Sequence, residues 1–343
     1  MDSLISTKFF VEIRLSGEKS MSQQIPITFS DKETTLTVEK RNLPHLLLAA
    51  MRPHQWTKNL FIFAPLLFGR KLTDSTAVGY SLLAFVVFCF LASGLYIFND
   101  WMDADEDRKH PEKRFRPISS GRLSVPFALT FAGFLVVTAF WLAAFVGLQF
   151  FLVAALYFVL TTAYCLALKR MMILDGMTIA AGFVLRVVGG AIAVGVMPTH
   201  WLIVCAFLLA LFLAFTKRRQ ELLTLSDHAA EHREVLNEYS IEYLEKVNNI
   251  LISAAIVCYA LYTVAPETVE RFGTNALIYG TIFVIYGLLR YLALIKNPSN
   301  GGNPSRMFLQ DKPLLLTVAG WTIYNASVIY HISFKESWLF IFG

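Results

Sequence analysis

Long apolar segments recur along this chain from residue 44 almost to its end, and they limit its fold more than any other feature. Each holds about 20 residues, the length at which an α-helix crosses a hydrocarbon core of roughly 30 Å. Backbone polar groups must be paired inside lipid, so we expect helices and not sheet. The sequence predicts an all-α, multi-pass membrane protein whose nine transmembrane helices span residues 44–69, 76–99, 123–146, 148–167, 173–196, 199–217, 247–266, 273–295 and 312–333.

Composition excludes several other classes of protein. The chain is 56% hydrophobic and only 16% charged, which is too apolar for an ordinary soluble domain. Its four cysteines lie in apolar stretches without a CxxC pair, so neither a disulfide framework nor a zinc site is expected. The basic residues gather at helix ends and form no continuous soluble face, so no nucleic-acid partner is expected.

Two regions stand apart from the apolar helices. Residues 1–43 are polar and form an N-terminal arm to which no role is assigned, so the domain division predicted is 1–43 and 44–343. Residues 226–246 are charged and predicted to be helical, and they are a candidate lid.

Basic residues are distributed unequally between the two ends of the predicted helices. The loops after the second, fourth, sixth and eighth helices hold most of them, whereas the opposite loops hold Arg70, Lys71, Arg271 and Lys335. By the positive-inside rule, the richer side is cytoplasmic. The sequence therefore predicts an inner (plasma) membrane protein with a cytoplasmic N-terminus and a cavity open to the cytoplasm.

An acidic stretch, NDWMDADEDRKHPEKRFRPISSG at residues 99–121, follows the second predicted helix without a break. At about 100° per residue, Asn99, Asp103, Asp107 and Asp100 fall at about 0°, 40°, 80° and 100° on one helix face. Magnesium takes hard oxygen ligands and completes its shell with water and phosphate. We therefore predict a Mg²⁺-diphosphate site in which Asn99, Asp103 and Asp107 bind the metal. The alternative is a solvated loop of mixed charge.

Cationic residues next to this stretch are candidates for binding the phosphate oxygens. Lys113, Arg114 and Arg116 follow the acids directly. Lys169 lies between the fourth and fifth predicted helices, and Lys217 lies at the end of the sixth. For Lys217 an equally good alternative is a positive-inside anchor.

Two further groups of polar residues lie within the predicted helices. On an α-helical wheel Gln55, Lys58 and Asn59 share one face with Arg52, although interfacial anchoring is an alternative for this end of the helix. Arg186 lies about 20° from Asp175 and roughly 16 Å further along the same helix. An arginine this deep needs a partner or a wet cavity, so the face is expected to point inward. A structural Asp–Arg pair is the alternative.

These stretches resemble the UbiA superfamily of intramembrane prenyltransferases. NDxxDxxxD followed by RP and SG resembles its first signature, and KRFRPI, RPxQWxKN and KRxxEL are similar to its decaprenyl-phosphate phosphoribosyltransferase branch. The second signature of the superfamily usually has two aspartates, DxxxD, but Asp175 has no carboxylate four residues later. This departure fits the phosphoribosyltransferase branch, where Lys169 and Asp175 match the corresponding motif.

The resemblance implies Mg²⁺-dependent transfer of 5-phosphoribose from phosphoribosyl diphosphate to a long-chain polyprenyl phosphate, with release of diphosphate, in cell-envelope synthesis. The catalytic residues it implies are Asp103, Asp107 and Asp175. The substrate-binding residues expected are Gln55, Lys58, Asn59, Asn99, Asp100, Lys113, Arg114, Arg116, Tyr164, Lys169, Arg186 and Lys217. A homo-oligomer in the lipid bilayer is compatible with the sequence.

Two other functions remain open at this point. A conventional prenyltransferase would move an isoprenoid chain from its diphosphate to an aromatic or lipid acceptor, and it would normally need two acidic motifs. A transporter or channel would use intramembrane charge to mark a permeation path. Against the transporter, the charges gather at one surface, and the far side has no matching polar gate.

Overall fold

The computed structural model describes residues 43–110, 113–225, 234–295 and 310–330, and every regular element in these ranges is a helix. The chain divides into two units, Met1–Leu43 and Pro44–Gly343. The predicted N-terminal arm and the first part of the candidate lid, residues 226–233, lie outside the described residues.

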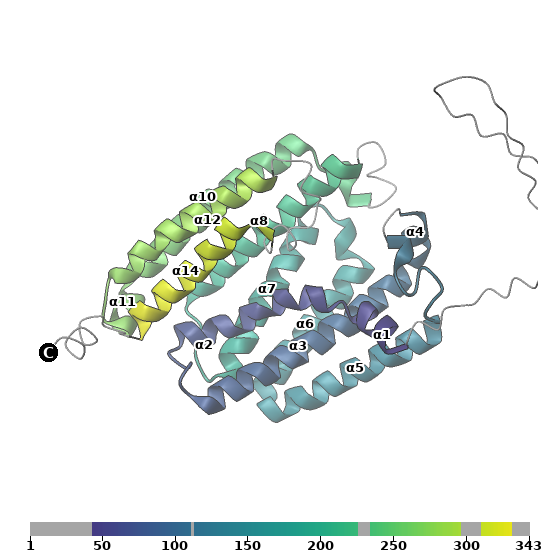
Figure 1. The fold of residues 1–343 in the computed structure, drawn as a ribbon, viewed down its shortest axis with the longest axis horizontal. Helices are drawn as coiled ribbons and strands as arrows, with labels where there is room; N and C mark the ends of the chain where they lie inside the picture. Colours follow the sequence, from purple (N-terminus) through teal and green to yellow (C-terminus); the bar gives the residue numbers. More distant parts are fainter. Residues whose placement is uncertain (1–42, 111–112, 226–233, 296–309, 331–343) are drawn as a thin grey trace, which may run out of the picture. The chain divides into compact units, whose positions relative to one another are not determined.

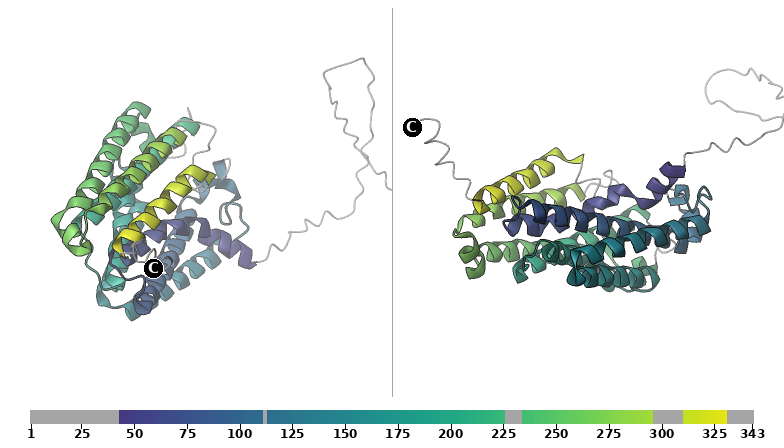
Figure 2. Two further views of the ribbon diagram at one scale, coloured as in Figure 1. Left: turned by 60° about the vertical axis from the view of Figure 1, so that its left-hand side comes forward. Right: turned by 90° about the horizontal axis from the view of Figure 1, so that it is seen from below.

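The helices of the second unit run side by side, with their axes roughly aligned (Figures 1 and 2). The long helices are α3 (Ser75–Met102), α5 (Val125–Val146), α6 (Leu148–Leu166), α7 (Leu174–Ala193), α8 (His200–Leu225), α10 (Ile241–Val264), α12 (Thr281–Ile295) and α14 (Lys312–Ile329). The shorter ones are α1 (Leu43–Met51), α2 (Ala64–Phe68), α4 (Ala104–Lys109) and α11 (Pro266–Phe272). The 3₁₀ helices are η1 (Pro53–Phe63), η2 (Lys113–Phe115), η3 (Leu168–Arg170), η5 (Glu234–Glu238) and η6 (Ala276–Gly280).

Seven helices in the described part are long and apolar enough to cross a membrane. They are Ser75–Met102, Val125–Val146, Leu148–Leu166, Leu174–Ala193, His200–Leu223, Ile241–Val264 and Ala276–Ile295. Phe134, Val137 and Trp141 are exposed on one side of α5, as expected for a face in contact with lipid. The prediction of an all-α, multi-pass membrane protein is confirmed, whereas the count of nine crossings is not.

The first predicted crossing, 44–69, is not one continuous helix. It is divided into α1, η1 and α2, and Arg52 at the first division has φ 54°. Pro53 and Pro65 both stand at helix starts, where proline is tolerated, but each would disrupt a continuous helix. The last predicted crossing corresponds to α14, where Lys312 and Asn325 lower the mean hydropathy of the helix.

The apolar side chains form two main buried clusters. One joins α3, α5, α6 and α7, and the other joins α8, α10 and α12. Helix α7 packs against α8 and so connects the two groups, with α3 on α5 and α10 on α8 as the other extensive pairings. In Figure 1 the first group is coloured blue to teal and the second mainly green.

Gly190 on α7 allows η1 to approach closely. A Cβ added at Gly190 would lie 2.1 Å from the backbone oxygen of Ile62 in η1, whereas a Cβ at Gly79 in α3 would meet nothing within 4 Å. Backbone cannot move aside as a flexible side chain can. The close contact of α7 with η1 therefore requires glycine at position 190.

We expect Gly190→Ala to lower the free energy of unfolding by about 1–3 kcal/mol, because overpacking forces backbone shifts. Thermal unfolding of the purified protein in nanodiscs measures this loss. Gly79→Ala is the matched control, and it should change stability by no more than about 1 kcal/mol, in the stabilising direction. Equal unfolding temperatures for the two variants would contradict the packing argument.

Candidate active site

The acidic stretch lies at the junction of α3 and α4. Asp103 separates the two helices, with φ −94° and ψ 8°, but its N–H still donates to Asn99 O at 2.9 Å. The Asp107 N–H in turn donates to Asp103 O at 2.8 Å. The chain therefore keeps nearly the same helical course through the junction, and the acids stay close to one another as the wheel predicted.

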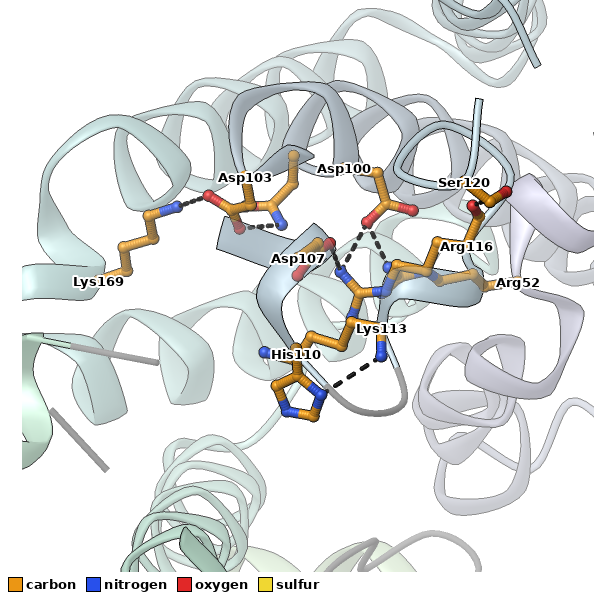
Figure 3. Close-up of polar contacts among 10 residues, drawn as sticks. Arg52, Asp100, Asp103, Asp107, His110, Lys113, Arg116, Ser120 and Lys169 are labelled. Atoms are coloured by element: carbon orange, nitrogen blue, oxygen red, sulfur yellow. Dashed lines mark hydrogen bonds and ion pairs between the residues drawn. The ribbon is translucent and has the colours of Figure 1, made fainter. Parts of the chain in front are cut away.

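Arg116 connects two of these acids (Figure 3). Its Nη1 donates to Asp100 Oδ1 at 3.1 Å and also to Asp107 Oδ2. The Arg52 Nη2 donates to the same oxygen of Asp100. Both carboxylates are buried, at 2% exposed for Asp100 and 3% for Asp107. Buried charges need partners, and these two arginines supply them.

Asp103 forms a second pair beside the first. Lys169 of η3 donates through Nζ to Asp103 Oδ1 at 2.5 Å, and Asn99 Nδ2 donates to Asp103 Oδ2 at 2.8 Å. The side chains of Lys169 and Asp103 are 18% and 23% exposed, so this pair is more accessible than the Asp100 and Asp107 carboxylates. The structure thus brings together Asn99, Asp100, Asp103, Asp107, Arg116 and Lys169 from the predicted set.

Burial raises the pKa of Asp107, and the nearby charges of Arg116 and Lys113 act in the opposite direction. Within the described residues, no group of three or more His, Cys, Asp or Glu side chains could by itself hold a metal ion. Magnesium usually takes only one or two carboxylates, with water and substrate phosphate as its other ligands. Asn99, Asp103 and Asp107 therefore offer the kind of oxygen ligands that magnesium takes when water and phosphate supply the rest, and they do not form a complete cage by themselves.

Arg186 lies deeper, in α7, and is 5% exposed. It donates from Nε to Asn59 Oδ1 at 2.6 Å, from Nη1 to Gly182 O at 2.7 Å and from Nη2 to Tyr157 OH at 2.8 Å. Its guanidinium also lies 4.7 Å from the centroid of the Tyr157 ring. All these partners are neutral. The face of α7 that carries Arg186 is buried, as predicted.

Asp175 occupies the other end of that face and is fully buried. It accepts a hydrogen bond from Tyr239 OH at 2.7 Å on Oδ1, and Arg218 Nε lies 3.5 Å from its Oδ2. The alternative of an Asp175–Arg186 pair is therefore wrong. The helical wheel placed the two residues on one face, but the side-chain partners of both lie outside α7.

Comparison with known proteins is consistent with this arrangement. Residues 60–316 match the model of the UbiA prenyltransferase family. The chain belongs to the UbiA prenyltransferase family. A relative from Corynebacterium glutamicum, named decaprenyl-phosphate phosphoribosyltransferase, is 33% identical over 298 residues, which cover 84% of this chain and 88% of the relative. A protein of the same name from Mycolicibacterium smegmatis is 31% identical over 300 residues, covering 84% of this chain and 94% of that protein.

Among solved structures, a UbiA homolog from Archaeoglobus fulgidus bound to GPP and Mg²⁺ shares the fold. Its TM-score is 0.65 at 20% sequence identity, with 83% of this chain and 99% of that chain covered. The family match confirms the resemblance to the UbiA superfamily drawn from the sequence motifs, and with it a membrane protein of several helices.

The remaining predicted residues of this UbiA chain are less closely gathered. Gln55 and Tyr164 are half-buried, on η1 and α6, and Arg114 is exposed with its guanidinium 4.7 Å from the Phe115 ring centroid. Lys113 lies in η2, where its N–H donates to His110 Nδ1 at 3.3 Å. Lys217 Nζ lies 3.8 Å from Glu221 Oε1.

The predicted shared face of Gln55, Lys58 and Asn59 is wrong, because η1 is a 3₁₀ helix. With three residues per turn, Lys58 lies above Gln55, and Asn59 points to another side. Asn59 is 1% exposed and donates to Cys89 Sγ at 3.1 Å, while Lys58 is half-buried. In the described part of the chain, the Lys58 ammonium has no ion-pair partner.

Two tyrosines that form hydrogen bonds with predicted site residues were not found from the sequence. Tyr157, the partner of Arg186, stands in an apolar run, where a lone tyrosine carries no signal. Tyr239, the partner of Asp175, stands in a polar loop outside every motif of the UbiA family quoted above. Spacing along the sequence would not have identified either.

Proposed function

We propose that this chain transfers 5-phosphoribose from phosphoribosyl diphosphate to a long-chain, decaprenyl-type polyprenyl phosphate and releases diphosphate. The observation that carries the proposal is the match to two proteins named decaprenyl-phosphate phosphoribosyltransferase over 88% and 94% of their lengths. The paired acidic and basic side chains at the α3–α4 junction support it, because both a metal-bound diphosphate and free phosphate oxygens need such groups.

The donor diphosphate is placed beside the α3–α4 junction in this proposal. Asn99, Asp103 and Asp107 would hold Mg²⁺, which neutralises charge on the departing diphosphate when bound. Arg116 and Lys169 pair with these acids in the substrate-free protein, and they would also donate hydrogen bonds to phosphate oxygens of the bound donor. The ribosyl carbon would become oxocarbenium-like as its bond to the diphosphate oxygen breaks.

The acceptor phosphate is placed closer to the deep cations, Lys58 and Arg186. An oxygen of polyprenyl phosphate is already anionic, so its attack on the ribosyl carbon needs no strong base. It needs positioning and the exclusion of water, which would otherwise react with the activated sugar. Asn59 fixes the guanidinium of Arg186, and the half-buried Lys58 lies in the same region of η1.

The membrane arrangement is part of the proposal. The α1–η1–α2 segment and α14 would complete the seven apolar helices to nine crossings around a cytoplasm-facing cavity. The chain would lie in the inner membrane with its N-terminus and site at the cytoplasm, as the placement of lysine and arginine suggests. Residues 44–343 would be the catalytic domain and 1–43 an additional arm.

Purified protein in nanodiscs, given labelled phosphoribosyl diphosphate, Mg²⁺ and polyprenyl phosphate, is expected to form a labelled lipid that mass spectrometry identifies as the phosphoribosyl product. Omitting Mg²⁺ should abolish it. Absence of labelled lipid would contradict the proposal. Diphosphate release from a prenyl diphosphate with an aromatic acceptor would instead indicate a conventional prenyltransferase, and metal-dependent transport without any product would indicate a transporter.

A further inference from the structure

The Tyr239 hydroxyl joins two parts of the chain that the sequence motifs do not connect. It donates to Asp175 Oδ1 at 2.7 Å and accepts the Ile173 N–H at 2.7 Å. Tyr239 follows η5, whereas Ile173 and Asp175 lie at the start of α7, so the bonds span more than 60 residues of chain. The tyrosine ring is itself buried and lies 6.0 Å from the Phe215 ring centroid.

The turn that receives these bonds is strained. Ile173 has φ 69° and ψ −48°, although it is β-branched and such residues avoid positive φ. Such a conformation persists only where the surroundings hold it. The Ile173 N–H donates to the Tyr239 hydroxyl, and the Asp175 N–H donates to Met171 O at 3.1 Å across the turn.

The same turn carries Lys169 to the acidic site. The connection between α6 and α7 consists of η3, which holds Lys169, and the residues up to Ile173. At one end Lys169 contacts Asp103 at 2.5 Å, and at the other Tyr239 holds Ile173. Since only three residues separate Lys169 from Ile173, a change of backbone conformation at Ile173 would move the ammonium group away from Asp103.

The two oxygens of Asp175 are buried, and only Oδ1 accepts a hydrogen bond among the described residues. Tyr239 occupies Oδ1, Arg218 faces Oδ2 at 3.5 Å, and the carboxylate is 0% exposed. Because the carboxylate is fully buried, neither oxygen is accessible to a substrate in this conformation, although Oδ2 has only the ion pair with Arg218. Asp175 therefore holds Tyr239 at the start of α7. Asp103 differs, because it is partly exposed beside Lys169.

We infer that Tyr239, together with Asp175, is a positioning residue that holds the α6–α7 turn so that Lys169 reaches the acidic site. The inference rests on the proposed function only where it concerns turnover, since the placement of Lys169 exists without substrate. It assigns Asp175 a supporting role in place of direct contact with the reacting groups, and it links the segment after residue 233 to the phosphate-binding cations.

The first test measures the exposure of Lys169 in substrate-free protein. Tyr239→Phe keeps the ring and removes both hydrogen bonds of the hydroxyl. Labelling of Lys169 by an amine-reactive ester, quantified by mass spectrometry against the exposed Lys246, should rise roughly fivefold, as expected when a buried hydrogen bond to a local turn is lost. Tyr243→Phe is the matched control, because Tyr243 stacks on Tyr239 and its hydroxyl has no assigned role. Unchanged labelling in folded Tyr239→Phe would overturn the inference.

A second test needs no variant and so remains decisive if Tyr239→Phe does not fold. Hydrogen exchange of the unaltered protein should show the Ile173 and Asp175 amides protected to the same degree as the middle of α7. Rapid exchange there would refute a turn held by Tyr239, whatever the enzymatic activity.

Turnover gives a third readout that a purely structural role would not produce. Tyr239→Phe should raise the KM for phosphoribosyl diphosphate by at least about fivefold and leave the KM for polyprenyl phosphate unchanged. The reason is that the variant displaces Lys169, which is proposed to bind only the donor. Equal changes in the two KM values would contradict the inference. Failure of the proposed function would appear differently, as absence of product with the predicted labelling and exchange still observed.

Discussion

Replacing Asp103 or Asp107 by asparagine is expected to lower kcat/KM for phosphoribosyl transfer by about 10²–10³-fold in each case. Asparagine keeps the size of the side chain and one oxygen but removes the negative charge that a divalent ion and Lys169 or Arg116 require. The two acids lie one helical turn apart and have different cationic partners, so neither can replace the other. Steady-state kinetics in nanodiscs measures the loss.

Asp105→Asn is the matched control for both variants. Asp105 lies on the same short helix, α4, but its side chain is 92% exposed and it pairs with Arg108 at the surface. An exposed ion pair contributes little, so kcat/KM should stay within about twofold of the unaltered protein. If Asp103→Asn and Asp107→Asn matched this control, the metal assignment at the α3–α4 junction would be wrong.

Magnesium binding to the unaltered protein gives a further test of the site. In the unaltered protein without substrate, Asp103 is paired with Lys169 and Asp107 with Arg116, so Mg²⁺ alone should bind weakly. Calorimetric titration should detect tighter binding once phosphoribosyl diphosphate supplies additional oxygen ligands. Tight binding of Mg²⁺ to the substrate-free protein would show that the metal is held elsewhere.

Local sequence patterns predicted the features that depend on local physics. Length and apolarity are sufficient to define a crossing helix, so the bounds of α3, α5, α6 and α7 were predicted to within three residues. The existence of α8, α10 and α12 was also predicted, but α8 ends eight residues later than expected, α10 begins six residues earlier and α12 begins eight residues later. The gathering of Asn99, Asp100, Asp103 and Asp107 also followed from helical periodicity, because the chain keeps its course through Asp103. Glycine at position 147, with φ 136°, allows the tight turn expected between the third and fourth crossings.

The features that were missed depend on contacts between distant parts of the chain. Arg186 donates to Asn59, which lies 127 residues away in the sequence, and Tyr239 donates to Asp175, which lies 64 residues away. No spacing rule predicts such pairs. The helical wheel also failed where its period did not apply. The segment around Lys58 is a 3₁₀ helix between two short α-helices, so the α-helical angles placed its side chains on the wrong sides.

Arg218→Met is expected to lower the free energy of unfolding by roughly 3–5 kcal/mol, the range found when one member of a buried ion pair is removed. The Arg218 side chain is 1% exposed and the Asp175 side chain 0%, so the remaining carboxylate would have no access to water. Thermal unfolding in nanodiscs, followed by tryptophan fluorescence, measures the loss. Methionine keeps much of the length of arginine and so limits the contribution of a cavity.

Arg219→Met tests whether charge alone is responsible. Arg219 is the next residue, is 11% exposed and pairs with Glu245, whose side chain is 50% exposed. Removing Arg219 leaves a carboxylate that water reaches, so the cost should be no more than about 1 kcal/mol. The double variant Arg218→Met with Asp175→Asn should recover much of the stability, because the fully buried carboxylate is removed as well. Glu221, the other ion-pair partner of Arg218, is 24% exposed and keeps Lys217 at 3.8 Å. If Arg218→Met alone were as stable as Arg219→Met, Asp175 would not depend on Arg218 for its charge. If the double variant were stable but still impaired in turnover, the loss of activity would come from the turn that carries Lys169 and not from unfolding.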